Sequence, residues 1–397
     1  MVVTSNKLIK SINRDGYTWY LYLMLAICGY HQSVLGSITP FLRDDMSLTK
    51  TVIGWHFGIY ALGLIATGRI VTTLSKRYST AKLTTASAWL MVSFVALLAV
   101  PMPLAGTLLG SLLLGLSGGA LQITVQETLA RYHGDNRGIA LTEGCVFAGL
   151  GVFTGPLVIG LAVKVGLSWR ETLLVPALLL GLLFLFSQRV SPSRFSKEIH
   201  LSATVENKKR RLPLSVFLVF GMILLGIATE WGVGFWGAQF LEVQLEVSPE
   251  TGVTLMSAFF GGTVIGRIFA SRLLQIFELH TILLSVIVLG AGSVLLLWAV
   301  PVFLTAILAL VFAGMCLGNF FPLILSIANE LAPNQAGPVS AGATQSVGMA
   351  LLFAPALLGG LGETIGLVNA VGLLAILPLA MLVLYALSTG FKVKVAV

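Results

Sequence analysis

Long apolar runs dominate the chain, and short polar or charged segments separate them. Several runs exceed about 18 residues with few charges, which is the length that a helix needs to cross the hydrocarbon core of a bilayer. Reading the runs against clusters of charged and turn-forming residues predicts twelve membrane helices. Their approximate bounds are 17–41, 52–74, 80–101, 105–130, 139–163, 169–188, 213–241, 250–275, 279–299, 302–330, 336–360 and 364–388. The pattern therefore predicts an all-α polytopic membrane protein.

The composition agrees with this class. Of the 397 residues, 56% are hydrophobic and 10% are charged, whereas a soluble domain carries about 25% charged residues. Most soluble enzymes and nucleic-acid-binding proteins are thereby excluded. The three cysteines, Cys28, Cys145 and Cys316, all lie inside apolar runs and predict no disulfide framework.

The distribution of Lys and Arg predicts the orientation of the chain. With the N-terminus in the cytoplasm, 20 of the 24 Lys and Arg residues fall in cytoplasmic segments, in agreement with the positive-inside rule. Arg43, Lys50, Lys164 and Arg170 remain outside. We therefore expect both termini in the cytoplasm. The same distribution accounts for the net charge of +8 without a nucleic-acid partner.

A polar stretch from Gln188 to Arg211 divides the predicted helices into six before it and six after it. It contains the run Lys208-Lys209-Arg210-Arg211. The expected organisation is an N-terminal six-helix bundle at 1–187, a cytoplasmic basic linker at 188–212 and a C-terminal six-helix bundle at 213–397.

The two halves repeat one another at an offset of 198 to 199 residues. Gly68-Arg69-Ile70 recurs as Gly266-Arg267-Ile268. A longer set of matches pairs Phe41, Gly115, Gly119, Gly138, Gly149, Pro156 and Gly160 with Phe240, Gly314, Gly318, Gly337, Gly348, Pro355 and Gly359. Single glycine matches are common in a chain with 43 glycines, but a near-constant register that includes a proline indicates a duplicated unit. The two bundles should therefore be pseudo-symmetric.

With these features the chain resembles the major facilitator superfamily over essentially its full length. The segments that carry the resemblance are Ser75-Lys76-Arg77 after the first Gly-Arg-Ile, its echo from Gly266 to Arg272, Gly151 to Pro156, Glu230 to Trp236, and Phe321-Pro322. Thr72 stands near the position where the family has an Asp. The resemblance implies two bundles that rock about a central site, lined chiefly by helices one, four, seven and ten, with five and eleven contributing.

Two ionisable residues in the middle of predicted helices are candidates for proton coupling. An offset of 199 places His31 of helix one and Glu230 of helix seven at equivalent depths in the two halves. An ionisable group in hydrocarbon is costly unless it faces a wet cavity or a partner, and both groups exchange protons. The alternative is a static pair that holds the bundles together.

Other polar and aromatic residues on these helices are candidates for substrate binding. Gly115, Gly119, Gln122 and Gln126 form one stripe on helix four, which lipid would reject. Three glycines after Glu230 could let helix seven open and expose carbonyl groups. The substrate-binding candidates are Tyr30, Gln32, Gln122, Gln126, Trp231, Trp236, Asn319, Phe321 and Gln345. The gate or structural candidates are Arg69, Glu127, Arg131, Glu143, Arg267 and Glu330.

The leading interpretation is a secondary active transporter for a small organic solute, coupled to protons, with a polar metabolite favoured. Drug or cation efflux by proton antiport is an alternative, which the Gly151–Pro156 motif weakly favours. A non-transporting receptor on a transporter fold is another. The sequence contains no HExxH, GxSxG or P-loop motif, so neither an enzyme, a metal site nor a cofactor is expected. We expect a monomer in a bacterial-type inner membrane.

Overall fold

The computed structural model describes residues 14–189, 212–333 and 335–395, and over these residues it contains helices and no strands. The first half comprises α1 (Gly16–Met46), α2 (Lys50–Leu74), α3 (Thr80–Leu98), α4 (Leu104–His133), η1 (Gly134–Asn136), α5 (Arg137–Lys164), α6 (Trp169–Thr172) and α7 (Val175–Arg189). The second half comprises α8 (Leu214–Gln244), α9 (Pro249–Leu273), α10 (Leu279–Ala299), α11 (Phe303–Leu317), α12 (Phe320–Leu331), α13 (Ala336–Thr364), α14 (Leu367–Leu373) and α15 (Ile376–Val395). Most of the predicted linker, with its basic run, lies outside the described residues.

Three predicted helices, 169–188, 302–330 and 364–388, are each broken into two in the structure. Pro176 and Pro378 follow two of the breaks. Proline has no backbone N–H to donate to the preceding turn, so it interrupts the helix at these places. Within the described residues, eleven helices are long and apolar enough to cross a membrane, when the segments Phe303–Leu331 and Leu367–Gly390 are taken across their breaks. The sixth predicted span is not among them, since α7 has 15 residues.

The contacts inside each half confirm the internal repeat. Gly115 of α4 lies against the backbone of Tyr60 in α2, and at an offset of 199 residues Gly314 of α11 lies against the backbone of Phe259 in α9. At each position a Cβ atom would collide with the facing carbonyl group. Glycine therefore sets the distance between these helices in both halves.

The Gly-Arg-Ile match is out of structural register by one residue. In α2 the Thr67 hydroxyl donates to the carbonyl of Leu116, at 3.1 Å. In α9 the position that packs at the equivalent place, against Met315, is Gly266. Thr67, rather than Gly68, is thus the structural counterpart of Gly266, because the packing of these helices follows the 199-residue offset.

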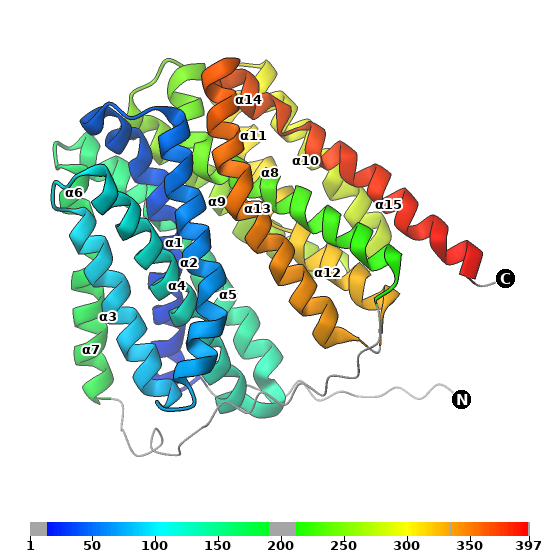
Figure 1. Cartoon of the computed structure of the whole chain (residues 1–397), viewed down its shortest axis with the longest axis horizontal. Coiled ribbons are helices and arrows are strands. Elements are labelled where there is room, and N and C mark those ends of the chain that lie inside the picture. The colour runs from blue at the N-terminus through cyan, green and yellow to red at the C-terminus, as the bar shows by residue number, and fades with distance from the viewer. Residues whose placement is uncertain (1–13, 190–211, 334, 396–397) are drawn as a thin grey trace.

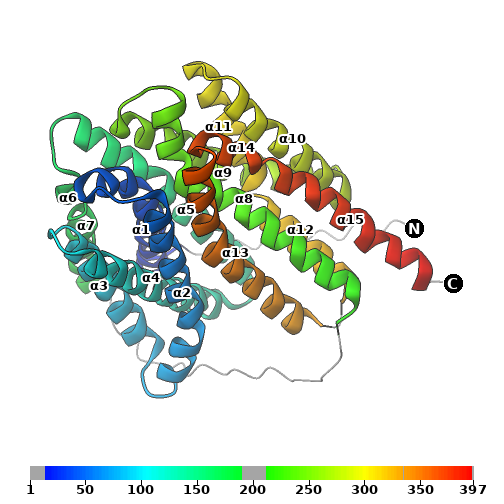
Figure 2. The same ribbon diagram turned by 45° about the horizontal axis from the view of Figure 1, so that its top comes forward.

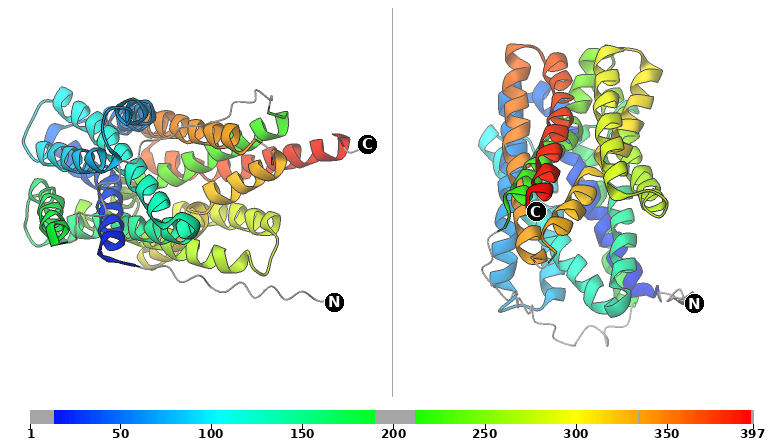
Figure 3. Two further views of the ribbon diagram at one scale, coloured as in Figure 1. Left: turned by 90° about the horizontal axis from the view of Figure 1, so that it is seen from below. Right: turned by 90° about the vertical axis from the view of Figure 1, so that its right-hand side faces the viewer.

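The two halves lie side by side as separate groups of helices (Figures 2 and 3) and meet along two equivalent interfaces, α5 with α9 and α2 with α13. Both interfaces contain glycines that pack against the other half. Among them are Gly149 with Val264, Gly160 with Glu250, Gly348 with Ile65, and Gly359 with Lys50. The contacts of Gly149 and Gly348 are equivalent at an offset of 199 residues, and those of Gly160 and Gly359 are equivalent to within one residue, so the interfaces are related by the same pseudo-symmetry.

The molecule is closed at one end. We call the end that carries the C-terminus of α7 and the N-terminus of α8 the linker end, and the opposite end the closed end. At the closed end Arg43 pairs with Glu242 across the halves, at 2.8 Å. There also the Glu363 carboxylate accepts a hydrogen bond from the backbone N–H of Thr51, at 3.0 Å. Helix termini expose unpaired N–H groups, so Glu363 of the second half caps α2 of the first.

Toward the linker end the two halves separate. The ribbons of α2 and α13 lie together near the closed end and diverge toward the linker end (Figure 1). Their glycine contacts stop at Ile65 and Gly348. Beyond this level Gly68 faces open space, and Arg69 and Gln345 are exposed. The conformation is therefore closed at one end and open at the linker end.

Candidate substrate-binding cavity

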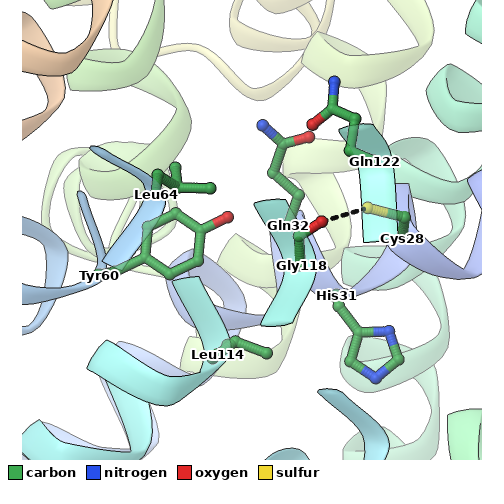
Figure 4. A pocket seen from close by; sticks show the side chains of 8 residues that line it. All are labelled: Cys28, His31, Gln32, Tyr60, Leu64, Leu114, Gly118 and Gln122. Atoms are coloured by element: carbon green, nitrogen blue, oxygen red, sulfur yellow. Dashed lines mark hydrogen bonds between the residues drawn. The ribbon is translucent and has the colours of Figure 1, made fainter. Parts of the chain in front are cut away.

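A small pocket lies within the first half, between α1, α2 and α4 (Figure 4). It is lined by Cys28, His31, Gln32, Tyr60, Leu64, Leu114, Gly118 and Gln122. The amide groups of Gln32 and Gln122 point to the same side of the pocket, and the Tyr60 hydroxyl points inward from α2. The Cys28 thiol donates a hydrogen bond to the carbonyl oxygen of Gly118, at 3.5 Å. The structure thus brings together three of the sequence candidates, His31, Gln32 and Gln122.

His31 is 1% exposed, and its two ring nitrogens have different surroundings. Its Nδ1 lies 2.7 Å from the carbonyl oxygen of Ile27, one helical turn earlier. Its Nε2 is buried and has no hydrogen-bond partner in the described part of the chain. His31 is therefore not bonded to Glu230 in this conformation, and one of its nitrogens remains available to a proton, a water molecule or a ligand.

Tyr60 was not among the sequence candidates. It lies on α2, which the family resemblance does not place among the principal cavity helices. The residue is 4% exposed, and its hydroxyl group lines the pocket. The sequence could have identified Tyr60 as a candidate, because it places a phenol within the apolar run 52–74. A buried phenol usually requires a polar partner.

Glu230 lies in the middle of α8, on the second half of the molecule. Its residue is partly buried, and Arg267 of α9 is an opposite charge that interacts with it electrostatically. One turn further along α8, the rings of Phe260 and Trp231 lie near Gly234, within ordinary contact distance of where its Cβ atom would sit.

The expectation that three glycines open this helix is wrong for this conformation. α8 is continuous from Leu214 to Gln244. A Cβ atom at Gly232 would contact the Leu374 side chain, and one at Gly237 would contact Met256. The glycines therefore admit neighbouring side chains and do not expose carbonyl groups.

The two tryptophans beside Glu230 occupy different environments. Trp236 is fully buried, and its Nε1 donates to the carbonyl of Pro355 at 3.0 Å. It also contacts Phe57 of α2 edge-on, with ring centroids 5.8 Å apart, and so belongs to the contacts between the halves. Trp231 is partly buried, with its ring 4.9 Å from that of Phe235. Of the two, Trp231 is the one that is not fully buried.

The other substrate-binding candidates are scattered. Tyr30 is buried, and its hydroxyl has no partner among the described residues. Asn319 is buried, and its amide donates to the carbonyl of Met315 at 2.7 Å, which satisfies a carbonyl group at the break between α11 and α12. Gln126 and Phe321 are partly buried, and Gln345 is exposed.

The gate candidates form their ion pairs and hydrogen bonds mostly within their own half. Glu143 pairs with Arg14 at 2.6 Å and accepts from the Tyr22 hydroxyl at 2.8 Å, so it ties α5 to the start of α1. Glu127 pairs with Arg131 along α4. In the second half, Glu330 lies 3.3 Å from His280, whose Nδ1 lies 2.8 Å from the Tyr385 hydroxyl.

The two arginines of the Gly-Arg-Ile motifs differ in their surroundings. Arg69 is exposed at the linker end of α2. Arg267 is also exposed, and its Nε lies 3.5 Å from the carbonyl of Gly318. Neither Glu143 nor Glu330 forms an ion pair with these arginines in the described residues.

Comparisons with known proteins agree on the fold. A variant of the peptide transporter POT is 15% identical, with a TM-score of 0.75, over 94% of this chain and 94% of that one. A bacterial homologue of the human lysosomal transporter Spinster, inward-facing and occupied, is 10% identical, with a TM-score of 0.74, over 94% and 96%. The nucleoside transporter NupG is 14% identical, with a TM-score of 0.73, over 93% and 98%.

These identities show a shared fold and do not transfer a substrate. No curated protein matches the sequence significantly. The sequence does match the model of the Major Facilitator Superfamily over residues 21–253, more than half of the chain. Together with eleven helices able to span a membrane in the described residues, this identifies a multi-pass integral membrane protein. The chain belongs to the Major Facilitator Superfamily.

Proposed function

We propose that the protein is a secondary active transporter that moves a small polar organic solute by alternating access, coupled to protons. The observation that carries this proposal is a pair of equivalent interfaces that are closed at one end and end at the level of Ile65 and Gly348. Because contact stops there, the halves can pivot about the middle of the molecule. The moving units are the bundles at 1–187 and 213–397, joined by the linker at 188–212.

The orientation follows from the charges. The Lys and Arg distribution assigns the linker end to the cytoplasm, so the structure corresponds to an inward-open conformation. Arg69 and Arg267 lie on the linker side of the interface contacts, where the cytoplasmic gate would close. Twelve spans, a bacterial inner membrane and a monomeric state complete the proposal.

Glu230 is the proposed proton-coupling residue, with His31 as its counterpart in the other half. Glu230 lies at the middle of α8, whereas Glu143 and Glu330 lie near helix ends. Glu230 carries the only charge at this depth of α8, and protonation would remove it. Because an ionised group is costly to remove from water, protonation would lower the free energy needed to close the cavity around this carboxyl group. The free Nε2 of His31 gives the first half a second exchangeable site.

The test is solute-driven proton flux in liposomes. Purified protein is reconstituted with an internal pH dye, a pH gradient is imposed, and sugars, organic acids, amino acids and cationic drugs are added in turn. The variant is Glu230→Gln, and the control is Glu246→Gln, the same change at an exposed position beyond the end of α8. We expect one solute class to drive proton movement in the wild type and the control but not in Glu230→Gln.

The alternatives give different results. Proton movement driven by cationic drugs alone would replace the polar metabolite with drug efflux. Solute movement without proton movement would refute the coupling and leave Glu230 with a binding or packing role. No movement of any solute in the wild type would favour the receptor alternative over transport.

A further inference from the structure

The second half contains a broken helix where the first half has a continuous one. α11 and α12 are separated at Gly318-Asn319, whereas α4, their counterpart at the 199-residue offset, is unbroken. Pro322 stands in α12 where α4 has Ile123. Proline has no N–H group to donate to the carbonyl of Gly318, four residues earlier, so α12 does not continue the hydrogen bonding of α11.

Side chains satisfy two carbonyl groups at this break. Nε of Arg267 lies 3.5 Å from the carbonyl oxygen of Gly318, and the Asn319 amide donates to the carbonyl of Met315 at 2.7 Å. A helix bends most readily where its own ladder of hydrogen bonds is interrupted by proline. The break is therefore the place where α12 can change its angle to α11.

The other end of α12 is tied to two further helices of the second half. Near the linker end, the Glu330 carboxylate lies 3.3 Å from Nε2 of His280, at the start of α10. Nδ1 of the same ring lies 2.8 Å from the hydroxyl of Tyr385, on α15. The side chains of His280 and Glu330 are 35% and 45% exposed, so water reaches the pair. His280 thus connects the end of α12 to α10 and α15.

Protonation of His280 strengthens this connection. A neutral imidazole has one N–H group, whereas a protonated one has two and a positive charge. The charged ring can donate to the Glu330 carboxylate and to the Tyr385 hydroxyl at the same time, and it gains a Coulomb attraction to the carboxylate. Histidine changes its charge between about pH 5 and 8, so the strength of this contact varies near physiological pH.

The ionisable groups around His280 favour its charged form. α10 packs against α11, α12, α14 and α15. Among the side chains that the structure describes on these four helices, the ionisable ones are Cys316, Glu330 and Tyr385, and Glu278 directly precedes α10. Two of these groups are carboxylates, and none is a cation that would repel the protonated ring.

We propose that His280 is a pH-sensitive latch for α12. The protonated ring holds Glu330, and α12 keeps the position described here, with the linker end open. When the ring is neutral the hold weakens, and α12 bends at Gly318-Asn319 as that end closes. This device goes beyond the proposed transport function, because it makes the open conformation of the linker end more stable when the cytoplasmic side is acidic.

Spin labels within the second half test the latch directly. One label replaces Ser326 on α12 and the other replaces Ser285 on α10, both exposed, in a variant without native cysteines. Rocking of whole halves leaves this distance unchanged, whereas bending of α12 changes it. From pH 8 to pH 6 we expect the ratio of the latched to the bent population to rise about two- to fivefold, the range for an exposed ion pair.

Three variants and a control accompany this measurement. His280→Gln and Glu330→Gln should each remove the pH dependence of the distance. Pro322→Ala restores an N–H group that the Gly318 carbonyl can accept, so it should lower the bent population at pH 8. The control is His133→Gln, the same change at the linker end of the first half, where the ring lies 3.1 Å from the Thr18 hydroxyl. This variant should respond to pH as the wild type does.

The outcomes separate the latch from the transport function. A distance that does not respond to pH in the wild type, or that still responds in His280→Gln, would overturn the latch. A bent population that Pro322→Ala leaves unchanged would refute the hinge at the break. The response should persist in Glu230→Gln, and its loss there would assign the pH dependence to Glu230 instead. Because the distance is measured without solute, a failure of solute flux would refute transport and leave this test of the latch intact.

Discussion

At the scale of single residues, Gln239 carries a fully buried amide group with no hydrogen-bond partner in the described part of the chain. It shares one face of α8 with Phe235, which stacks on Phe57 of the other half, and with Glu242, which pairs with Arg43. An unsatisfied buried amide costs about 1–3 kcal/mol. Opening the closed end would admit water and remove this cost, so Gln239 favours the open form of that end.

Replacing this amide should therefore stabilise the conformation described here. Gln239→Leu is expected to raise the melting temperature in detergent and to slow transport, because the closed end becomes harder to open. A larger population of the closed conformation should also appear as shorter distances between two spin labels, one placed in each half at the closed end. Gln239→Glu adds charge at the same size and should shift both readouts in the opposite direction. A lower melting temperature for the leucine variant would contradict this role.

At the scale of helices, glycines set how closely α1 and α5 approach. A Cβ atom at Gly151 would collide with the carbonyl of Ala26, and one at Gly29 would collide with the carbonyl of Ala148. Backbone atoms cannot rotate away as a side chain can, so a larger residue must separate the helices. We expect Gly151→Val to lower the melting temperature and the yield of folded protein.

The matched control for this change is Gly292→Val in α10. Gly292 has open space where its Cβ atom would sit, and both substitutions introduce the same β-branched side chain into a helix. Comparable losses in the two variants would mean that helix propensity, rather than the contact between α1 and α5, is responsible.

At the scale of the whole molecule, two polar contacts hold the closed end. Arg43 and Glu242 occupy pseudo-symmetric positions 199 residues apart, and both side chains are 19% exposed. Glu363 caps α2 at Thr51. We expect Glu242→Gln and Glu363→Gln each to weaken the closed end by about 1 kcal/mol, a roughly fivefold shift in the conformational equilibrium.

Accessibility measures this shift directly. A single cysteine placed in the closed end of a variant without its native cysteines should react faster with a membrane-impermeant reagent in either glutamine variant. The effects should add in the double variant if the two contacts act independently. The same reactivity in wild type and double variant would show that packing of Phe57 and Phe235 holds this end without the charges.

The features that depend on local pattern were predictable from the sequence. Long apolar runs identified the membrane helices, because span length and hydropathy are local properties. The repeat was visible because duplicated glycines and a proline keep their spacing, as Gly149 and Gly348 illustrate. The equivalence of His31 and Glu230 followed from the same offset.

The neighbours that each side chain contacts were decided by the tertiary structure. Trp231 and Trp236 share a helix, but rotation about its axis places the second against Phe57 of α2, in the contacts between the halves. Glu143 reaches Arg14 rather than Arg69, because α5 packs on the start of α1. The phenol of Tyr60 lines the pocket because α2 and α4 meet at a glycine. Spacing determines which residues share a helix face, whereas the rotation and packing of neighbouring helices determine what that face meets.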